Sequence, residues 1–273
     1  MLSSLSAGVS GLENFQEQMD VIGNNIANIN TTAFKAGTID FADAFSNTLQ
    51  GAGATTPAMQ VGTGVEVAGI GSNWTEGGIT NTGNQSNLAI SGAGFFEVVD
   101  PVTGAKYLTQ DGTFSVNSAG DLVTAGGDYV QGYTGSSTTL GNIQVTTDPA
   151  KTGVSISSYT IDTEGHINVE QSDNTTYVSG QVLLQNVQAP QMLVSQGNNL
   201  YSNWESAGPN AALGAPGASG LGTIQAGALE SSNVDLSNEM ANLITAQRAF
   251  EANSKIITTG NEVLQTVVNM KQS

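Results

Sequence analysis

Hydrophobic positions near the start of the chain recur every three or four residues. Such spacing places apolar side chains on one face of an α-helix. Four of them are seven residues apart, the period of a helix that packs along a second helix. The pattern ends at Asn28, where asparagine and β-branched residues lower helix propensity. The full series is Leu2, Leu5, Val9, Leu12, Met19, Ile22 and Ile26.

The end of the chain carries a stronger version of the same pattern. A seven-residue series runs Leu236, Leu243, Phe250, Ile257 and Leu264, and the alternate seam positions are Met240, Gln247, Ser254, Asn261 and Val268. Polar residues at such positions fix the register of paired helices at a cost in stability. A second row, Ala249, Ile256, Val263 and Met270, lies one residue before the first. The apolar face is therefore wider than one partner helix needs, which predicts contacts with further helices.

The last helix is predicted to run from about Asp235 to Met270. Ser231, Ser232 and Asn233 offer N-cap oxygens just before it, and acidic residues in its first turn suit the positive end of the helix dipole. At 1.5 Å per residue the helix would be ~54 Å long. Few globular domains need a helix of that length.

The middle of the chain alternates apolar and polar residues in short runs, as β-strands do. The clearest runs are Val65–Val67, Phe95–Val99, Thr113–Val116 and Tyr177–Val182. Turn residues separate them at Asp111–Gly112, Asn117–Gly120, Gly126–Asp128 and Glu164–Gly165. We expect an antiparallel β domain built from hairpins. Two segments rich in small residues, 48–64 and 206–222, are predicted to be irregular linkers or extended arms.

These patterns predict an α+β fold, with long N- and C-terminal helices that pack as a coiled-coil-like stem and a central antiparallel β-rich domain. Residues 1–35 and 228–273 are assigned to a discontinuous helical polymerisation domain. Residues 36–72 are assigned to an extended connecting segment, and residues 73–227 to a β-rich outer domain. A stem that merely closes a monomeric β domain is the alternative interpretation of the helices.

Charge and composition narrow the possible partners. The chain has 6 Lys and Arg against 23 Asp and Glu, a net charge of -17, and no basic run, so nucleic acid is not expected as a partner. It has no cysteine, which excludes disulfides, thiolate metal sites and cysteine nucleophiles. No run approaches ~18 apolar residues, and Met1–Leu5 lacks the basic start of a signal peptide. Membrane insertion and signal-peptide cleavage are therefore not expected.

Candidate chemistry is sparse. The single histidine, His166, lies close to Asp162 and Glu164, which is compatible with metal ligands on one strand face but more typical of a solvated hairpin. The sequence contains no G-x-S-x-G elbow, and the Gly92-Ala93-Gly94 run lacks the third glycine and the helix of a dinucleotide fingerprint. A pair of glycosidase carboxylates needs no fixed spacing, so it stays a minor alternative. We predict no catalytic residue, no metal site and no cofactor.

The N-terminal helix and the segment after it carry a specific resemblance. Gly11-Leu12, the run Met19–Asn28 and the run Thr32–Lys35 are similar to the N-terminal signature of bacterial flagellar rod and hook proteins. Ala33 stands where that family usually has glycine. Segments 87–96, 107–114, 120–123 and 232–255 also resemble the family. The signature residues are Asn24, Asn25, Ala27, Asn28, Phe34 and Lys35.

The resemblance implies a non-enzymatic structural subunit of the flagellum. It implies a helical tube of identical subunits, with the terminal helices lining the inner tube and the β domain outside them. It also implies contacts with neighbouring rod, hook and hook-filament junction proteins, and export through the flagellar type III apparatus. The residues predicted to carry self-assembly are Leu5, Leu12, Met19, Ile22, Ile26, Leu236, Met240, Leu243, Phe250, Ile257, Leu264 and Val268.

Two members of this family fit the sequence, the hook protein and the distal rod protein. Residues 41–46, 81–84 and 264–270 look more like the hook protein, whose tube transmits torque for motility. The length of 273 residues looks more like the distal rod protein, because hook proteins usually carry an extra outer domain. The sequence favours a short hook-type subunit, with the distal rod as the alternative. An extracellular adhesin is a remote third possibility, and it predicts a signal peptide.

Overall fold

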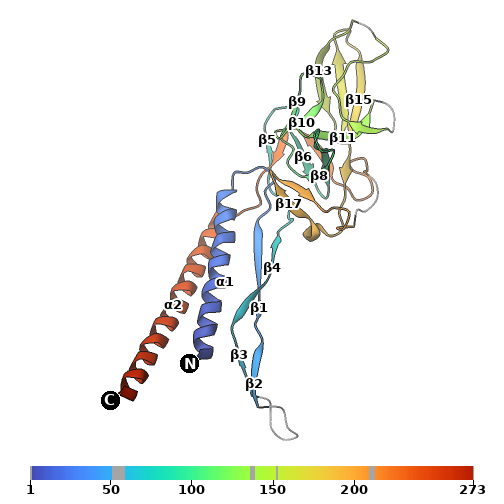
Figure 1. The fold of residues 1–273 in the computed structure, drawn as a ribbon. Coiled ribbons are helices and arrows are strands. Elements are labelled where there is room, and N and C mark those ends of the chain that lie inside the picture. The colour runs from blue at the N-terminus through green and yellow to red at the C-terminus, as the bar shows by residue number, and fades with distance from the viewer. Residues whose placement is uncertain (1, 51–58, 136–138, 152, 209–212, 273) are drawn as a thin grey trace. The chain divides into compact units, whose positions relative to one another are not determined.

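The computed structural model describes residues 2–50, 59–135, 139–151, 153–208 and 213–272 (Figure 1). Its contacts divide the chain into two compact units. The helical unit comprises residues 1–29, 36–73 and 234–273, and the β unit comprises residues 30–35 and 74–233. The fold class is α+β, with a helix near each end of the chain and a β-rich centre, as the sequence predicts.

Two long helices, α1 (Leu2–Ala27) and α2 (Leu236–Gln272), form most of the helical unit and lie side by side in opposite directions (Figure 1). Their bounds are within about two residues of those that periodicity predicts. The predicted N-cap of α2 was wrong. Asp235, one residue before the helix, accepts hydrogen bonds at Oδ1 from the backbone N–H of Ser237 (2.8 Å) and Asn238 (3.3 Å). Ser231–Asn233 lie too far upstream to reach those groups.

The helical unit also contains a long hairpin between residues 36 and 73. Strand β1 (Gly37–Asp43) pairs antiparallel with β4 (Val65–Ser72), and β2 (Ser46–Gln50) pairs with β3 (Met59–Gly62). The prediction that residues 48–64 are irregular is therefore wrong for β2 and β3, while residues 51–58 lie outside the described part of the chain. Backbone hydrogen bonding between two strands does not require alternating apolar side chains, so this pairing left no hydrophobic signal.

The β unit is built on a 12-stranded sheet, in which the described pairings are antiparallel. Its longest path runs β13-β14-β15-β11-β7-β8-β18-β17. The strands are β7 (Phe95–Val99), β8 (Lys106–Thr109), β9 (Phe114–Val116), β10 (Leu122–Thr124), β11 (Tyr129–Thr134), β12 (Leu140–Asn142), β13 (Ile156–Ile161), β14 (His166–Gln171), β15 (Thr176–Val182), β16 (Leu184–Gln185), β17 (Val194–Gly197) and β18 (Leu200–Ser202).

Two short strand pairs and one helical turn complete the β unit. Strand β6 (Leu88–Ser91) pairs with β19 (Thr223–Ala226), and β5 (Ile79–Asn81) pairs with β20 (Ala228–Glu230). The 3₁₀ helix η1 spans Pro190–Met192. Each of the four runs predicted from the sequence to be strands overlaps a strand of the structure, which confirms the antiparallel β prediction.

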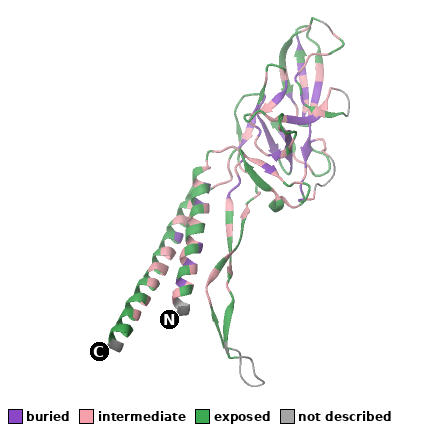
Figure 2. Cartoon of the chain, in the orientation of Figure 1, coloured by how far each residue is buried: buried purple, intermediate pink, exposed green. Residues whose placement is uncertain are grey.

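The hydrophobic core lies inside the β unit, where Figure 2 shows most of the buried positions. In the larger cluster, Phe96 contacts Phe114 edge-on, with ring centroids 5.1 Å apart. A smaller cluster contains Phe95 and Tyr201, with Trp74 packed against them. The β unit thus contains its own hydrophobic core, although Val102, Leu140 and Met192 at its surface are exposed.

The unit boundaries differ from the predicted domain boundaries. Residues 36–73 group with the helices rather than forming a separate connecting segment. Residues 30–35 and 228–233 group with the β unit, because Ala33 N–H donates to the Glu230 carbonyl (2.9 Å) and β20 pairs with β5. Hydrophobic periodicity identifies the two helices. It does not show that the residues next to them, 30–35 and 228–233, belong to the β unit.

Candidate assembly surface

Small residues of α1 bring the two helices into close contact. A Cβ atom added at Gly8 would lie 3.2 Å from the Ile257 side chain, and one added at Gly11 would lie 2.5 Å from Asn253 Nδ2. On the α2 side, Ala246 is almost completely buried. A Cβ atom at either position would crowd the facing side chain of α2, so Gly8 and Gly11 allow the two helices to pack closely.

Beside this contact face, α2 exposes apolar side chains on both flanks. One group, near the start of α2, is Leu236, Met240 and Ile244, spaced four residues apart. The other group, in the C-terminal half, is Ile256, Val263, Val267 and Met270, with exposed fractions of 47%, 48%, 45% and 67%. At 100° per residue the two groups lie on opposite sides of the face that contacts α1. Apolar side chains in this number and spacing are typical of an interface.

The residues predicted for self-assembly differ in burial, and most of them are at least half-buried. Ile22 is buried, while Leu5, Leu12, Met19, Ile26, Leu243, Phe250, Ile257 and Leu264 are half-buried. Leu236, Met240 and Val268 are exposed. The predicted seam is therefore not covered by one intramolecular partner along its whole length. Whether these residues mediate self-assembly stays a prediction.

Two buried asparagines of α1 fasten the hairpin to the helix. Asn25 donates from Nδ2 to the Gly37 carbonyl (2.9 Å) and accepts at Oδ1 from the Gly37 N–H (2.8 Å). Asn14 donates from Nδ2 to the Val65 carbonyl (2.9 Å). Each asparagine binds the backbone of one strand, β1 or β4, so the hairpin is held at two points along α1.

A buried ion pair closes the base of the β unit. Lys35 Nζ lies 2.7 Å from Glu230 Oε1, and both side chains are 2% exposed. Lys35 also donates to the Thr75 carbonyl (3.2 Å), and the Gly77 N–H donates to Glu230 Oε1 (2.8 Å). These bonds join the three segments at which the chain enters or leaves the β unit, which contain Lys35, Thr75–Gly77 and Glu230. Burial, with a smaller contribution from the Glu230 charge, raises the pKa of nearby Tyr201 to about 12.

Comparison with known proteins assigns the family. Models named flagella basal body rod protein, flagellar hook protein FlgE/F/G D1 domain, and flagellar basal body rod FlgEFG protein C-terminal match residues 5–35, 89–169 and 225–270. The flagellar basal-body rod protein FlgG of Bacillus subtilis is 38% identical over the whole of both chains. The chain belongs to the flagellar rod and hook protein family. It is therefore a structural protein of the bacterial flagellum and not an enzyme.

Other relatives include rod and hook proteins. The FlgG protein of Borreliella burgdorferi is 33% identical over the whole of both chains. The flagellar hook protein FlgE of Salmonella typhimurium is 27% identical over an alignment of 415 residues, which covers 98% of this chain and all of the relative. Among the described residues, no helix is apolar over enough of its length to cross a bilayer.

The structure gives the family signature residues identifiable local roles. Asn25 binds β1, as described above, and Asn28 donates from Nδ2 to Asn24 Oδ1 (2.8 Å) just beyond the end of α1, whose last residue is Ala27. The Phe34 carbonyl accepts from the Asn233 N–H (3.3 Å), and Lys35 forms the buried ion pair. The signature thus covers the end of α1 and the entry to the β unit.

Ala33, where the family resemblance predicts glycine, has a backbone conformation that favours glycine. Its φ angle is 53°, in the left-handed region that favours glycine. It is buried, and its N–H donates to the Glu230 carbonyl. The departure from glycine that the sequence revealed therefore falls on a residue with constrained backbone geometry.

Sequence reasoning missed two of these features. Glu230, the partner of Lys35, is separated from it by 195 positions, and no local pattern links them. Asn14 interrupts no apolar series and is unremarkable in the sequence. A lysine within an otherwise uncharged stretch was the one available signal that Lys35 has a fixed partner.

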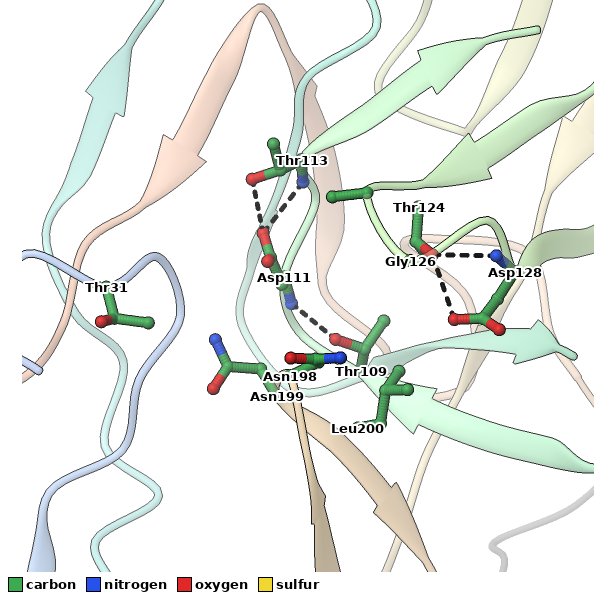
Figure 3. Close-up of a pocket in the computed structure, with 11 residues that line it drawn as sticks. Thr31, Thr109, Asp111, Thr113, Thr124, Gly126, Asp128, Asn198, Asn199 and Leu200 are labelled. Carbon is green, nitrogen blue, oxygen red and sulfur yellow. Dashed lines mark hydrogen bonds between the residues drawn. The ribbon is translucent and has the colours of Figure 1, made fainter.

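Acidic residues elsewhere in the β unit close turns. Asp111 and Asp128 are among the residues that line a cavity of about 300 Å³. Figure 3 shows how these lining residues lie. Asp111 Oδ1 accepts from the Thr113 N–H (3.0 Å) and hydroxyl (2.6 Å), and the Asp128 carboxylate accepts from the Thr124 hydroxyl (3.1 Å). Each carboxylate therefore stabilises its own loop.

His166 lies where the hairpin interpretation predicts, at the start of β14. Its Nδ1 is 3.2 Å from Asp162 Oδ2 and 3.8 Å from Glu164 Oε2, and all three side chains are at least one-third exposed. Asp162 Oδ1 also accepts from the His166 N–H (2.8 Å), which closes the β13–β14 turn. No group of three or more potential metal ligands occurs among the described residues.

Proposed function

We propose that this chain is the distal rod subunit of the flagellar basal body, which self-assembles into a helical tube through α1 and α2. The exposed apolar flanks of α2 carry this proposal. Burial of each large apolar side chain contributes roughly 1.5–3 kcal/mol, and in a single copy the flanking side chains remain in water. Neighbouring copies placed on both flanks would cover them, and a patch that binds a different patch on the next copy generates an open polymer.

In this proposal α1 and α2 form a coiled-coil-like stem inside the tube, with the β unit outside it. Ser254 and Asn261 occupy seam positions of α2 where leucine would bind more strongly. Polar residues there specify register at the expense of stability, which suits a contact that must repeat identically in many copies. We also propose neighbouring rod, hook and hook-filament junction proteins as partners, and the flagellar type III apparatus as the export route.

The similarity to relatives favours assignment to the distal rod. Some sequence segments favour the hook instead. Rod proteins from several bacteria are 32–38% identical to this chain over 97–100% of its length. The alignment with the hook protein spans 415 residues, whereas this chain has 273, so a large part of the hook protein has no counterpart here. That difference matches the extra outer domain expected of hook proteins.

A short hook protein is the second candidate. Residues 41–46, 81–84 and 264–270 resemble the hook protein, and the hook relative aligns with 98% of this chain. Both candidates use the same helix pair for assembly. They differ in where the polymer lies along the flagellum.

Electron microscopy of basal bodies from a strain lacking this gene tests the proposal. Truncated rods without hooks are expected, and the intact gene supplied on a plasmid should restore both. Complete rods that lack only the hook would assign the chain to the hook instead. Complete flagella in the deletion strain would rule out either axial role.

A further inference from the structure

The exposed face of α1 is acidic and has no counterion within the described structure. Glu13, Glu17 and Asp20 are four and three residues apart, so they share one face of the helix, and all three are exposed. None forms an ion pair with another described residue. The sequence of α1 contains no Lys or Arg that could neutralise this face.

Half of the cations in the chain are paired in the β unit. Lys35, Lys106 and Lys151 are paired in the β unit with Glu230, Glu97 and Asp173. The other three, Arg248, Lys255 and Lys271, belong to α2. If the acidic face of α1 contacts a cation in the helical unit of a second copy, that cation must therefore belong to α2.

Arg248 and Lys255 match the acidic face in spacing. They are seven residues apart, as are Glu13 and Asp20, which gives about 10.5 Å along the axis for each pair. Both cations are exposed, and the Lys255 ammonium has no ion pair among the described residues. Arg248 is 2.9 Å from Glu251, in a pair whose side chains are 76% and 65% exposed. Such exposed pairs contribute little and exchange partners readily.

The two charged faces cannot meet within one chain. Glu13 lies two residues after Gly11, which contacts α2, and two residues turn a helix by about 200°. Lys255 likewise lies two residues before Ile257, which faces α1. Each charged face is therefore on the far side of its own helix from the other helix.

We propose that the acidic face of α1 binds Arg248 and Lys255 of α2 in a second copy of this chain, with Glu13 opposite Lys255 and Asp20 opposite Arg248. This inference rests on the proposed self-assembly and adds its electrostatic contact. Opposite charges in register both attract the correct neighbour and exclude misaligned ones. Glu251 also lies on this α2 surface and comes opposite Glu17 in this register, where its own Arg248, 2.9 Å away, offsets the like charge. A neighbour displaced by four residues would instead place Glu13 opposite Glu251.

The intramolecular packing fixes how far the second copy is displaced. Gly8 lies beside Ile257 and Gly11 beside Asn253, so Glu13 is level with a point near residue 251 of its own α2. Pairing with Lys255 requires a shift of three to four residues, or about 5 Å along the axis. The second copy therefore lies beside the first at nearly the same height.

Charge reversal in the full-length chain tests the contact in cells that lack the native gene. E13K/D20K and R248E/K255E are each expected to abolish swimming and complete rods, because like charges would then face each other. The four-fold variant that combines them is expected to restore both. E164K/E205K is the matched control, since it makes the same charge change in the β unit and is expected to swim normally. Unimpaired swimming of both reversed variants, or no recovery in the combined variant, would overturn the pairing.

Cross-linking tests the contact directly, and the absence of native cysteine makes it specific. E13C/K255C, treated with a short bis-maleimide in isolated basal bodies, is expected to give dimers and higher oligomers on a denaturing gel. E13C/E170C is expected to remain monomeric. Assembled rods of E13C/K255C that yield no oligomer would refute the contact while leaving the rod function intact. Loss of the rod function itself would instead appear as complete flagella in the deletion strain.

Discussion

The two units of this protein handle apolar surface in opposite ways. The β unit encloses Phe96, Leu184 and their neighbours between its own strands. The helical unit leaves Ile256, Val263 and Met270 of α2 in water, although they continue the periodicity of a packed helix. A sheet can close a core within one chain, whereas two helices cover only one stripe of each other. The β unit therefore has a core of its own, and under the proposed function neighbouring copies would cover the exposed side chains of α2.

The largest expected stability effect is in the closed core. Phe96→Ala removes a side chain with no exposed surface and should lower the free energy of unfolding by about 3–5 kcal/mol. Guanidinium unfolding monitored by tryptophan fluorescence measures this, since Trp74 and Trp204 both lie in the β unit. Val263→Ala is the comparison in the helical unit, followed by circular dichroism of the helices because both tryptophans lie in the β unit, with an expected change within about 0.5 kcal/mol. Equal losses for the two variants would contradict the contrast between the units.

The buried ion pair should be nearly as sensitive. Lys35→Met leaves the Glu230 carboxylate buried without its cation, which costs about 3–5 kcal/mol. K35M/E230L, which removes both charges, should recover most of that loss in the same unfolding experiment. Lys151→Met breaks a pair with Asp173 whose side chains are about one-third exposed, and should lower the free energy of unfolding far less. A small effect of Lys35→Met would mean that water reaches Glu230.

Alkaline pH should weaken the β unit through Tyr201. Its pKa is raised from 10.0 to about 12 in the folded protein, so the folded state holds the phenol proton more strongly. The associated stability is complete below pH 10 and is lost as pH rises from about 10 to 12. This rise in the pKa of Tyr201 corresponds to roughly 2–3 kcal/mol of folding stability.

Comparison of Tyr201→Phe with the native chain measures this contribution. Unfolding free energies should fall less steeply between pH 9 and 11.5 in the variant, because it has no phenol to ionise. Identical slopes for the two proteins would show that Tyr201 ionises freely in the folded state.

A smaller gain is expected at an exposed turn of the β unit. Ser219 has a φ of 53° and is exposed, so Ser219→Gly relieves left-handed strain without emptying a packed site. The free energy of unfolding should rise by about 0.5–1 kcal/mol. Ser219→Ala keeps the Cβ atom and should be close to neutral. A stabilising alanine would point to the hydroxyl rather than to backbone strain.

The smallest stability change should accompany a complete loss of function. Val263→Asp places a charge on the exposed flank of α2 and should change the stability of the isolated chain by no more than about 0.5 kcal/mol. In the assembled tube the same charge would be buried, so complete rods and swimming should be lost. Val263→Thr, of similar shape and uncharged, should retain them. Normal rods from Val263→Asp would show that this flank is not an interface.

Sequence periodicity was sufficient for the two helices and for several individual strands. The apolar series ending at Ile26 and the one beginning at Leu236 match α1 and α2, and the alternating runs match β4, β7, β9 and β15. Local patterns succeed here because side chains that repeat with a helix or strand period must share one face. They gave no signal for β2 and β3, whose described residues are mostly exposed on both faces.

The sequence by itself determined the two helices, the antiparallel β centre, the absence of cysteine chemistry and, through its signature, the family. Only the tertiary structure decided which seam residues α1 covers, because coverage depends on the angle at which a second helix approaches. It also decided that Lys35 pairs with Glu230 and that Asn14 and Asn25 hold the hairpin. These contacts join residues far apart in the chain, and their energy comes from burial, which no local pattern records.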